Sequence, residues 1–202
     1  MDNTFPESTG KESAKLLDGY IADIAKGDRD ALADLYHHSS ASVYAFALSI
    51  LKNVHDAEDV LQDCYLRIHD CAGSYRSHGK LMAWILTIAR NLCMMRLREK
   101  IKTAELTDED WNAALSESCE TNIDDRILLT QCLSRLRDDE RQIVVLHAVA
   151  GFRHREIAAF LDMPLPTVLS KYSRSLKKLK ENLERRAWHD EPGNRSKTQA
   201  GL

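Results

Sequence analysis

The chain has 202 residues and a mass of 22.9 kDa, enough for one large domain or two small ones. Hydrophobic residues make up 44% and charged residues 29%, which is typical of a folded globular protein and excludes a disordered chain, a collagen-like repeat and a membrane bundle. Aromatic residues are only 6%, and 8 glycines with 4 prolines are too few for the frequent turns of a strand-rich sandwich. We therefore expect an all-α fold of two small helical lobes.

No stretch approaches the roughly 18 consecutive apolar residues of a membrane-spanning helix, and residues 1–15 hold no apolar run behind a basic start. We expect a cytoplasmic protein without membrane insertion of its own. The cysteines are odd in number and form no C-x-x-C pair, which indicates reduced, mostly packed thiols; a redox sensor is the alternative. They are Cys64, Cys71, Cys93, Cys119 and Cys132. The 8 histidines are scattered, and no nucleophile, phosphate-loop or metal motif occurs, so we predict no enzyme, no cofactor and no metal site.

Charge changes sign in blocks along the chain, although the net charge is only −3. Residues 53–70 are acidic, residues 76–102 are basic, residues 103–125 are acidic with no Lys or Arg, and residues 153–186 are basic again. Two basic lobes on either side of an acidic linker indicate a nucleic-acid-binding protein with a second, non-DNA partner. Solvated helix faces are the simpler alternative, which charge alone does not exclude.

In the first lobe, apolar residues recur at helical spacing over residues 56–68, with Asp56 as the expected N-cap. The predicted buried stripe is Ala57, Val60, Leu61, Cys64 and Ile68. Glu58, Asp59, Gln62 and Asp63 lie off that stripe. The helix is therefore expected to present an acidic face to solvent or to a partner.

A second helix follows the small and polar loop at residues 73–79. Its predicted buried stripe is Leu81, Trp84, Ile85, Ile88, Leu92 and Met95. The opposite side is predicted to form a polar and basic ridge, made of Lys80, Thr87, Arg90, Asn91, Met94 and Arg98. Because Trp84 falls in the apolar stripe, we interpret it as a core residue and not as a base-stacking one.

The C-terminal lobe has the pattern of a helix-turn-helix, in which the second helix enters the major groove of DNA. A short helix over residues 155–161 is broken at Asp162, and a second helix begins at about Leu165. The residues predicted to point inward are Val168, Tyr172, Leu176, Leu179 and Leu183. Those predicted to point outward are Ser170, Lys171, Arg174, Lys177 and Lys178. A two-helix turn with a basic surface but no DNA-binding role is the alternative.

Four motifs in this order resemble those of the extracytoplasmic-function branch of bacterial RNA polymerase sigma factors. They are Lys26-Gly27-Asp28, the segment 56–63, the segment 83–91 (AWILTIARN), and Glu156-Ile157-Ala158 followed by Thr167-Val168. The resemblance covers roughly residues 20–183. It implies an N-terminal tail (1–19), a sigma region 2 lobe (20–102), an acidic linker (103–125), a region 4 lobe (126–186) and a C-terminal tail (187–202).

The resemblance also implies partners: core RNA polymerase through the clamp of its largest subunit, promoter DNA, and an anti-sigma factor. The residues matched to the clamp-binding segment are Asp56, Glu58, Asp59, Gln62 and Asp63. Those matched to the segments that hold the unwound −10 element and capture an extruded base are Arg76, Lys80, Arg90, Asn91 and Arg98. Those matched to −35 recognition are Thr167, Ser170, Lys171, Arg174, Lys177 and Lys178.

Three positions depart from the family pattern: Asp162 stands where Gly is usual in the turn, Pro166 where Gly precedes Thr-Val, and Leu169 where Lys is common. Pro166 is compatible with the first turn of a helix, where N–H groups have no partner. These departures motivate one alternative to a promoter-reading subunit, a sigma-like module that titrates an anti-sigma factor. A conventional helix-turn-helix regulator is the other alternative, although it would leave the first 100 residues without a purpose.

Overall fold

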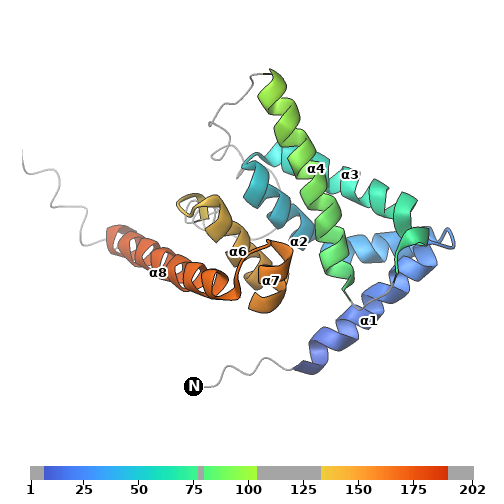
Figure 1. Cartoon of the computed structure of the whole chain (residues 1–202), viewed down its shortest axis with the longest axis horizontal. Coiled ribbons are helices and arrows are strands. Elements are labelled where there is room, and N and C mark those ends of the chain that lie inside the picture. Colours follow the sequence, from blue (N-terminus) through green and yellow to red (C-terminus); the bar gives the residue numbers. More distant parts are fainter. Residues whose placement is uncertain (1–6, 77–79, 104–132, 191–202) are drawn as a thin grey trace, which may run out of the picture. The chain divides into compact units, whose positions relative to one another are not determined.

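The computed structural model describes residues 7–76, 80–103 and 133–190, and every element of regular structure in these residues is a helix (Figure 1). The chain divides into two compact units, the first built on helices α1 to α4 and the second on α6 to α8. This confirms the expected all-α fold with two helical lobes. Residues 104–125 of the predicted linker lie outside the described residues, as do Cys119 and Cys132.

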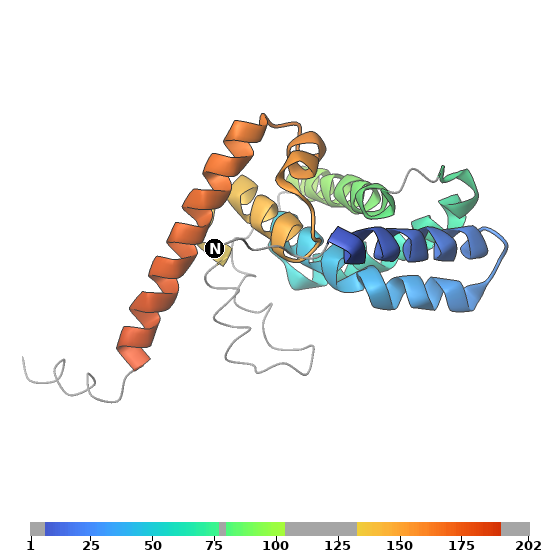
Figure 2. The same ribbon diagram turned by 90° about the horizontal axis from the view of Figure 1, so that it is seen from below.

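The described residues of the first unit form four α-helices and one short 3-10 helix. They are α1 (Glu7–Ile24), α2 (Arg29–Leu51), α3 (Val54–Cys71), η1 (Ala72–Ser74) and α4 (Leu81–Thr103). Helices α1 and α2 pack side by side, as Figure 2 shows, and α2 also contacts α3 and α4. The turn between α1 and α2 places Gly27 at φ 92°, and Asp28 then caps α2 by accepting the backbone N–H groups of Asp30 and Ala31. Helix α1 begins within the residues assigned to an N-terminal tail.

The core of the first unit lies where α2, α3 and α4 meet. The predicted stripe of α3 is confirmed at its buried positions, Ala57, Val60, Cys64 and Ile68, whereas Leu61 is half-buried. The predicted stripe of α4 is rotated. The buried residues of α4 are Leu81, Ile85, Leu86, Ala89 and Cys93, while Trp84, Ile88 and Leu92 are half-buried and Met95 is 53% exposed.

Two of the cysteines are core residues. Cys64 and Cys93 are free and buried, and burial raises the pKa of each thiol to about 12. A thiol held protonated in this way is a poor nucleophile, because the thiolate is the reactive form. Cys64 and Cys93 are therefore packed, unreactive thiols, as expected from the sequence, and Cys71 is free and half-buried.

A polar contact crosses the interface between α2 and α3. The hydroxyl of Ser39, which is fully buried, donates to the carbonyl of Leu35 over 2.6 Å and lies 2.6 Å from the hydroxyl of Tyr65. Because the single hydroxyl hydrogen of Ser39 is directed to Leu35, Tyr65 must be the donor in the second bond. Burial raises the pKa of the Tyr65 phenol, which keeps that hydrogen in place.

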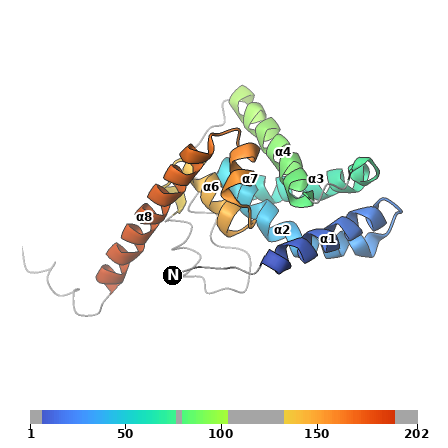
Figure 3. The same ribbon diagram turned by 60° about the horizontal axis from the view of Figure 1, so that its bottom comes forward.

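The second unit contains α6 (Asp138–Ala148), α7 (His154–Phe160) and α8 (Leu165–Asp190), which Figure 3 shows from another side. Gly151 turns the chain between α6 and α7 with φ 71°, and Leu146, Ile157 and Val168 form the centre of the core. Helix α8 begins at Leu165, as predicted. No described helix is long and apolar enough to cross a membrane.

The turn between α7 and α8 is a Schellman motif. The N–H of Met163 donates to the carbonyl of Ala158, and Asp162, the residue directly before Met163, adopts the left-handed conformation with φ 53°. This position is usually occupied by Gly, but Asp tolerates it better than most residues with a side chain. The carbonyl of Pro164 then accepts the N–H groups of the first turn of α8, where Pro166 needs no donor.

Candidate polymerase and nucleic-acid interfaces

The first candidate interface is the outward face of α3, which we call the acidic face and define by Asp59, Gln62, Asp63 and Leu66. All four side chains are exposed, with Asp59 57% and Leu66 67% accessible. Asp59 accepts a hydrogen bond from Arg96 of α4 at 2.6 Å. The face therefore combines two carboxylates and an amide with one apolar side chain, which suits a protein partner better than it suits nucleic acid.

Two of the five residues predicted for polymerase binding, Asp56 and Glu58, lie outside the acidic face. Asp56 is not the N-cap of α3, because Asn53 takes that role and accepts the backbone N–H of Asp56 at 2.9 Å. The Asp56 side chain is only 14% exposed and forms an ion pair with Lys100 of α4 at 2.5 Å. Glu58 is half-buried, 3.9 Å from the ring nitrogen Nδ1 of His55.

Sequence reasoning missed the ion pairs between α3 and α4. Arg96 and Lys100 are four residues apart on one helix, and Asp59 and Asp56 are three residues apart on the other, so each pair shares one face. That complementary spacing was the available signal. Sequence reasoning also missed Leu66, because a single apolar residue on a polar helix face forms no repeating pattern.

The second candidate interface is the ridge along α4, defined by Lys80, Thr87, Asn91 and Arg98, all of which are exposed. Lys80 comes directly before the helix, and the other three follow at helical spacing on the side opposite to Ala89. Arg90 and Met94, predicted for the same ridge, are half-buried. The ridge thus keeps four of its predicted members.

The loop before α4 is tied to the helical core by an aromatic contact. The rings of Tyr75 and Trp84 lie 5.0 Å apart, and the Tyr75 hydroxyl donates to Asp18 of α1 at 3.1 Å. Trp84 is half-buried and therefore stabilises the loop through its ring contact with Tyr75. Arg76, the neighbour of Tyr75, is exposed, while residues 77–79 lie outside the described residues.

The third candidate interface is the outward face of α8, which we call the reading face and define by Ser170, Arg174 and Lys177. All three are exposed, and the Arg174 guanidinium donates to the Ser170 carbonyl at 3.1 Å. Lys177 is 79% exposed and its nearest anion is Glu181, 4.0 Å away. Thr167, in the first turn of α8, is half-buried.

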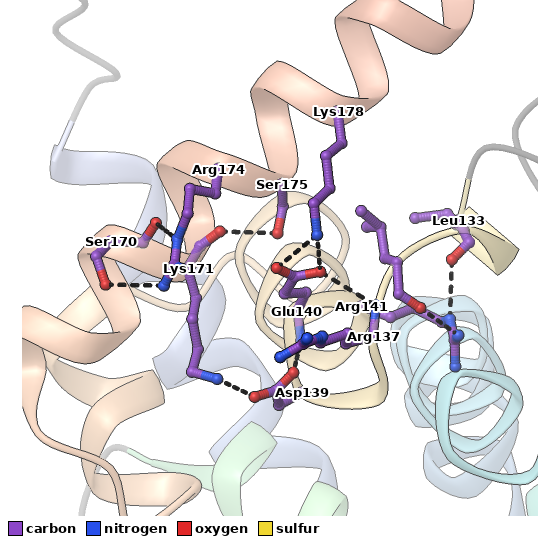
Figure 4. A network of polar contacts seen from close by, with 11 residues as sticks. Leu133, Arg137, Asp139, Glu140, Arg141, Ser170, Lys171, Arg174, Ser175 and Lys178 are labelled. Carbon is purple, nitrogen blue, oxygen red and sulfur yellow. Dashed lines mark hydrogen bonds and ion pairs between the residues drawn. The ribbon is translucent and has the colours of Figure 1, made fainter.

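The prediction that Lys171 and Lys178 also point outward is wrong. Lys171 forms an ion pair with Asp139, and Lys178 donates to both oxygens of Glu140 at 2.7 and 2.8 Å (Figure 4). Both acceptors lie in the first turn of α6. The two lysines therefore face the helix that α8 packs against.

The predicted inward stripe of α8 is also only partly correct. Val168 and Ser175 are buried, and Tyr172 and Leu179 are half-buried, but Leu176 is 45% and Leu183 44% exposed. Leu169 is exposed as well. The apolar residues of α8 thus extend past the surface that the described helices α6 and α7 cover.

Glu140 is the centre of the polar network between α6 and α8. Its side chain is only 6% exposed, and besides Lys178 it accepts the backbone N–H of Arg137 at 3.1 Å. Burial by itself raises the pKa of Glu140, but the hydrogen bonds from Lys178 and Arg137 outweigh it and hold the pKa below its usual value. The carboxylate is therefore ionised and fully engaged at neutral pH.

Asp139, the neighbour of Glu140, is held in the same way. Burial raises its pKa, but hydrogen bonds from Lys171 and from the backbone N–H of Glu140, together with the charges of Lys171 and Arg137, lower it overall. Arg141 lies behind this pair, 3% exposed, and its guanidinium donates to the carbonyls of Leu133 and Leu136 at 3.0 and 2.8 Å. Hydrogen bonds and ion pairs therefore hold the first turn of α6 in place.

Three rings join the helices of the second unit. His147 of α6 stacks on His154 of α7 with centroids 4.4 Å apart, and Tyr172 of α8 contacts both edge-on at 4.8 and 4.7 Å. The His147 Nδ1 lies 2.8 Å from the carbonyl of Phe152 and must donate to it. Burial, and then the proximity of His147, lower the pKa of His154, whose Nε2 is buried without a hydrogen bond.

Both units match known protein families. A family model described as Sigma-70 region 2 matches residues 35–103, and one described as Sigma-70, region 4 matches residues 126–179. The first range falls on α2 to α4 and the second extends into α8. The two domains therefore define a protein of the sigma-70 type.

Curated relatives narrow the class. The chain is 27% identical over 176 residues to the ECF RNA polymerase sigma factor SigK of Mycobacterium ulcerans, covering 83% of this chain and 94% of that protein. It is 27% identical over 176 residues to the ECF sigma factor SigW of Bacillus subtilis, covering 81% of this chain and 94% of SigW. The chain belongs to the extracytoplasmic-function family of RNA polymerase sigma factors.

Solved structures share the fold. The sigma factor RpoE, crystallised with the anti-sigma factor NepR from Bartonella quintana, aligns with a TM-score of 0.59 at 24% identity, covering 75% of this chain and 96% of RpoE. CnrH, in complex with the cytosolic domain of CnrY, aligns with a TM-score of 0.57 at 21% identity, covering 84% of this chain and 98% of CnrH.

Proposed function

We propose that this chain binds core RNA polymerase and directs transcription from specific promoters, with each of its two units making a separate contact. The observation that carries the proposal is the division of charge between exposed faces. Helix α3 presents Asp59 and Asp63 outward, whereas the reading face of α8 presents Arg174 and Lys177. A negative face suits a basic protein surface, and a positive helix face suits DNA.

In this proposal the acidic face binds the clamp of the largest polymerase subunit. The exposure of Asp59, Gln62 and Asp63 supports this role, and Leu66 adds an apolar anchor beside them. Asp56 and Glu58 contribute indirectly, because their side chains are directed to neighbours within the unit. Charged rim residues of this kind govern the rate of encounter and the choice of partner more than the final affinity.

The ridge of α4 holds the unwound −10 element. Lys80 and Arg98 neutralise phosphates at its two ends, and Asn91 offers both donor and acceptor atoms to an unstacked base. Arg76 and Arg90 complete the proposed set. The reading face of α8 contacts the −35 element, with Ser170 and Arg174 near base edges and Lys177 near phosphate. Residues 20–102 and 126–186 are the proposed limits of the two functional regions.

Regulation is proposed from the relatives. RpoE was crystallised with the anti-sigma factor NepR, and we assign a partner of that type to this chain. The chain would work in the cytoplasm as a binding subunit of the polymerase, without catalysis of its own. Titration of an anti-sigma factor without transcription is the second candidate, favoured by the exposed Leu169 on the proposed DNA-binding helix.

The test is reconstitution. Purified chain is mixed with core polymerase and genomic fragments, and the transcripts are sequenced at their 5′ ends. Discrete start sites that share upstream elements are the expected result. Core polymerase alone and chain with both Arg174→Ala and Lys177→Ala are the controls, and neither should give those start sites. If the chain binds core polymerase but yields no specific start sites, the titrating function gains and the promoter-reading one is rejected.

A further inference from the structure

Two ion pairs join one side of α8 to α6, in addition to the ring contact of Tyr172 with His147. Lys171 and Lys178 are seven residues apart, which is two helical turns and about 10 Å along the axis. Their acceptors, Asp139 and Glu140, are adjacent residues in the first turn of α6. Between the two lysines, the buried hydroxyl of Ser175 donates to the Lys171 carbonyl at 2.8 Å (Figure 4).

We propose that Lys171 and Lys178 are positioning residues, which set the angle of α8 against α6 and thereby aim Ser170, Arg174 and Lys177 at the DNA. This inference rests on the proposed function of α8 as the DNA-reading helix. It separates the four basic residues predicted to contact the −35 element into two groups with different tasks. Lys171 and Lys178 hold the helix, and Arg174 and Lys177 contact DNA.

The exposures of the lysines support this division. Lys177 is 79% exposed, whereas Lys171 is 21% and Lys178 43% exposed. Moving Lys178 to a phosphate would leave Glu140, 6% exposed, as a buried carboxylate without its cation, which is strongly unfavourable. Lys177 has no such tie, because its nearest anion is 4.0 Å away and itself half exposed.

The geometry explains why two anchors are needed. The ion pair of Lys171 and the ring contact of its neighbour Tyr172 fix one point on α8 but leave the helix free to tilt about that point. Two ion pairs, about 10 Å apart along the axis, fix its direction. A displacement of under about 1 Å is enough to break a hydrogen bond to a base edge. The angle of the helix therefore decides whether Arg174 reaches its acceptor.

The positioning role and a direct DNA contact predict opposite signs for one substitution. Asp139→Asn removes a negative charge close to the proposed DNA surface. If Lys171 contacts phosphate, this change strengthens DNA binding or leaves it unaltered, because it frees the lysine and reduces repulsion. If Lys171 positions α8, the same change weakens sequence-specific binding, because it loosens the anchor.

The experiment uses the full chain assembled with core polymerase. A sequence is first selected by the unmodified assembly from a library of randomised duplexes. Affinities for the selected duplex and for a scrambled one are then measured at several salt concentrations. The variants are Asp139→Asn, Lys171→Met, the swapped pair Asp139→Lys with Lys171→Asp, and Lys177→Met as the control for a phosphate contact. Thermal unfolding of each variant accompanies the binding data.

We expect Asp139→Asn and Lys171→Met each to reduce the preference for the selected duplex by about two- to fivefold, the range spanned by partly exposed ion pairs. Their salt dependence should stay unchanged, whereas Lys177→Met should lower the salt slope by about one. The swapped pair should regain the preference, because it restores the anchor with the charges reversed.

The proposal is overturned if Lys171→Met lowers the salt slope by about one while Asp139→Asn leaves or improves binding. It is also overturned if the swapped pair binds no better than the single variants. If the unmodified assembly selects no sequence, the proposed function itself fails, and this inference fails with it. Because the carboxylate of Glu140 is more buried than that of Asp139, variants of the Lys178–Glu140 pair serve only as a second measurement. They are used only where thermal unfolding shows that they fold.

Discussion

Arg96 of α4 donates to the carboxylate of Asp59 on α3 at 2.6 Å, so a residue of the basic sequence block neutralises one of the acidic block. Lys100 and Asp56 repeat this pairing at 2.5 Å. The reversal of charge between residues 53–70 and 76–102 is therefore partly an internal feature of the first unit. What remains for a partner is the exposed part, in which Asp63 forms no ion pair with another described residue.

The first prediction concerns Asp63. Asp63→Lys should lower the affinity for core polymerase at least tenfold, because it reverses a charge in the proposed contact, and mutual repulsion of like charges in an interface costs several kcal/mol. Since Asp63 is exposed, the free energy of unfolding should change by less than about 0.5 kcal/mol. Binding is measured by fluorescence anisotropy with labelled chain, and stability by urea unfolding.

Asp34→Lys is the matched control, since Asp34 is an exposed acidic residue on α2, away from the acidic face. It should bind like the unmodified chain. Equal losses of affinity for both variants would show that net charge matters and not the acidic face. An unaltered affinity of Asp63→Lys would remove α3 from the proposed contact.

The second prediction concerns the left-handed residue of the turn between α7 and α8. Asp162→Gly should stabilise the second unit by about 0.5–1 kcal/mol, because Gly adopts φ 53° without steric cost, although it adds entropy to the unfolded chain. Asp162→Ala should destabilise it by about 1 kcal/mol. Urea unfolding followed by circular dichroism measures both. A less stable Gly variant would mean that the Asp162 side chain has a favourable contact that outweighs its backbone strain.

The third prediction concerns pH. The pKa of His154 is lowered below 6.5 in the folded chain by burial and by His147, so the unfolded chain binds a proton more readily. The stability of the second unit should therefore be complete above about pH 6.5 and should fall as the pH drops below that value. It should level off once the pH lies below the pKa of the folded state.

His154→Phe tests the origin of this effect, because phenylalanine keeps a ring between His147 and Tyr172 without a proton-binding group. The midpoint of unfolding, measured from pH 7.5 down to about pH 5, should depend less on pH in this variant than in the unmodified chain. The pKa values of Asp139 and Glu140 are lowered, so the stability that their carboxylates contribute to the folded unit is lost only at more acidic pH. A slope that is unchanged in His154→Phe would assign the pH dependence to another group.

The fourth prediction separates two residues of the reading face. Lys177→Ala should weaken binding to all duplexes and lower the salt slope by about one, as expected for a lost phosphate contact. Arg174→Ala should cost roughly 1–3 kcal/mol at one position of the −35 element and relax the preference there. The measurement is affinity for duplexes substituted one base pair at a time, at several salt concentrations. Identical behaviour of the two variants would contradict the division.

Local patterns predicted the helices and much of the packing. The stripe on α3 is correct at Ala57, Val60, Cys64 and Ile68, because that helix buries one side only. The stripe on α4 was misplaced because the helix packs against both α2 and α3, which widens and rotates its buried face. Met95 is apolar but falls outside that face, so its hydrophobicity was a misleading guide.

The errors on α8 have a different cause, which is length. Helix α8 has 26 residues, whereas α6 and α7 have 11 and 7, so the described helices of its own unit cover only part of it. Periodicity reports which residues share a side but not where the neighbouring helix ends. Leu183 therefore follows the pattern of a core residue and is nevertheless 44% exposed. Lys171 and Lys178 were misassigned because their carboxylate partners lie more than 30 positions away in the sequence.

The hydrogen bond from Tyr65 to Ser39 adds a directional contact to the apolar packing that aligns α2 and α3. If one helix slid by a turn of about 5.4 Å along the other, the contacts of buried residues such as Phe46 and Ile68 would change and the two hydroxyls would move apart. Such a slide would leave the Tyr65 hydroxyl buried with no partner, at a cost of about 1–3 kcal/mol, whereas Ser39 would keep its bond to Leu35 on its own helix. This contact therefore helps to hold the acidic face of α3 at one height along α2, and a Tyr65→Phe variant would keep the helices while weakening the preference for this register.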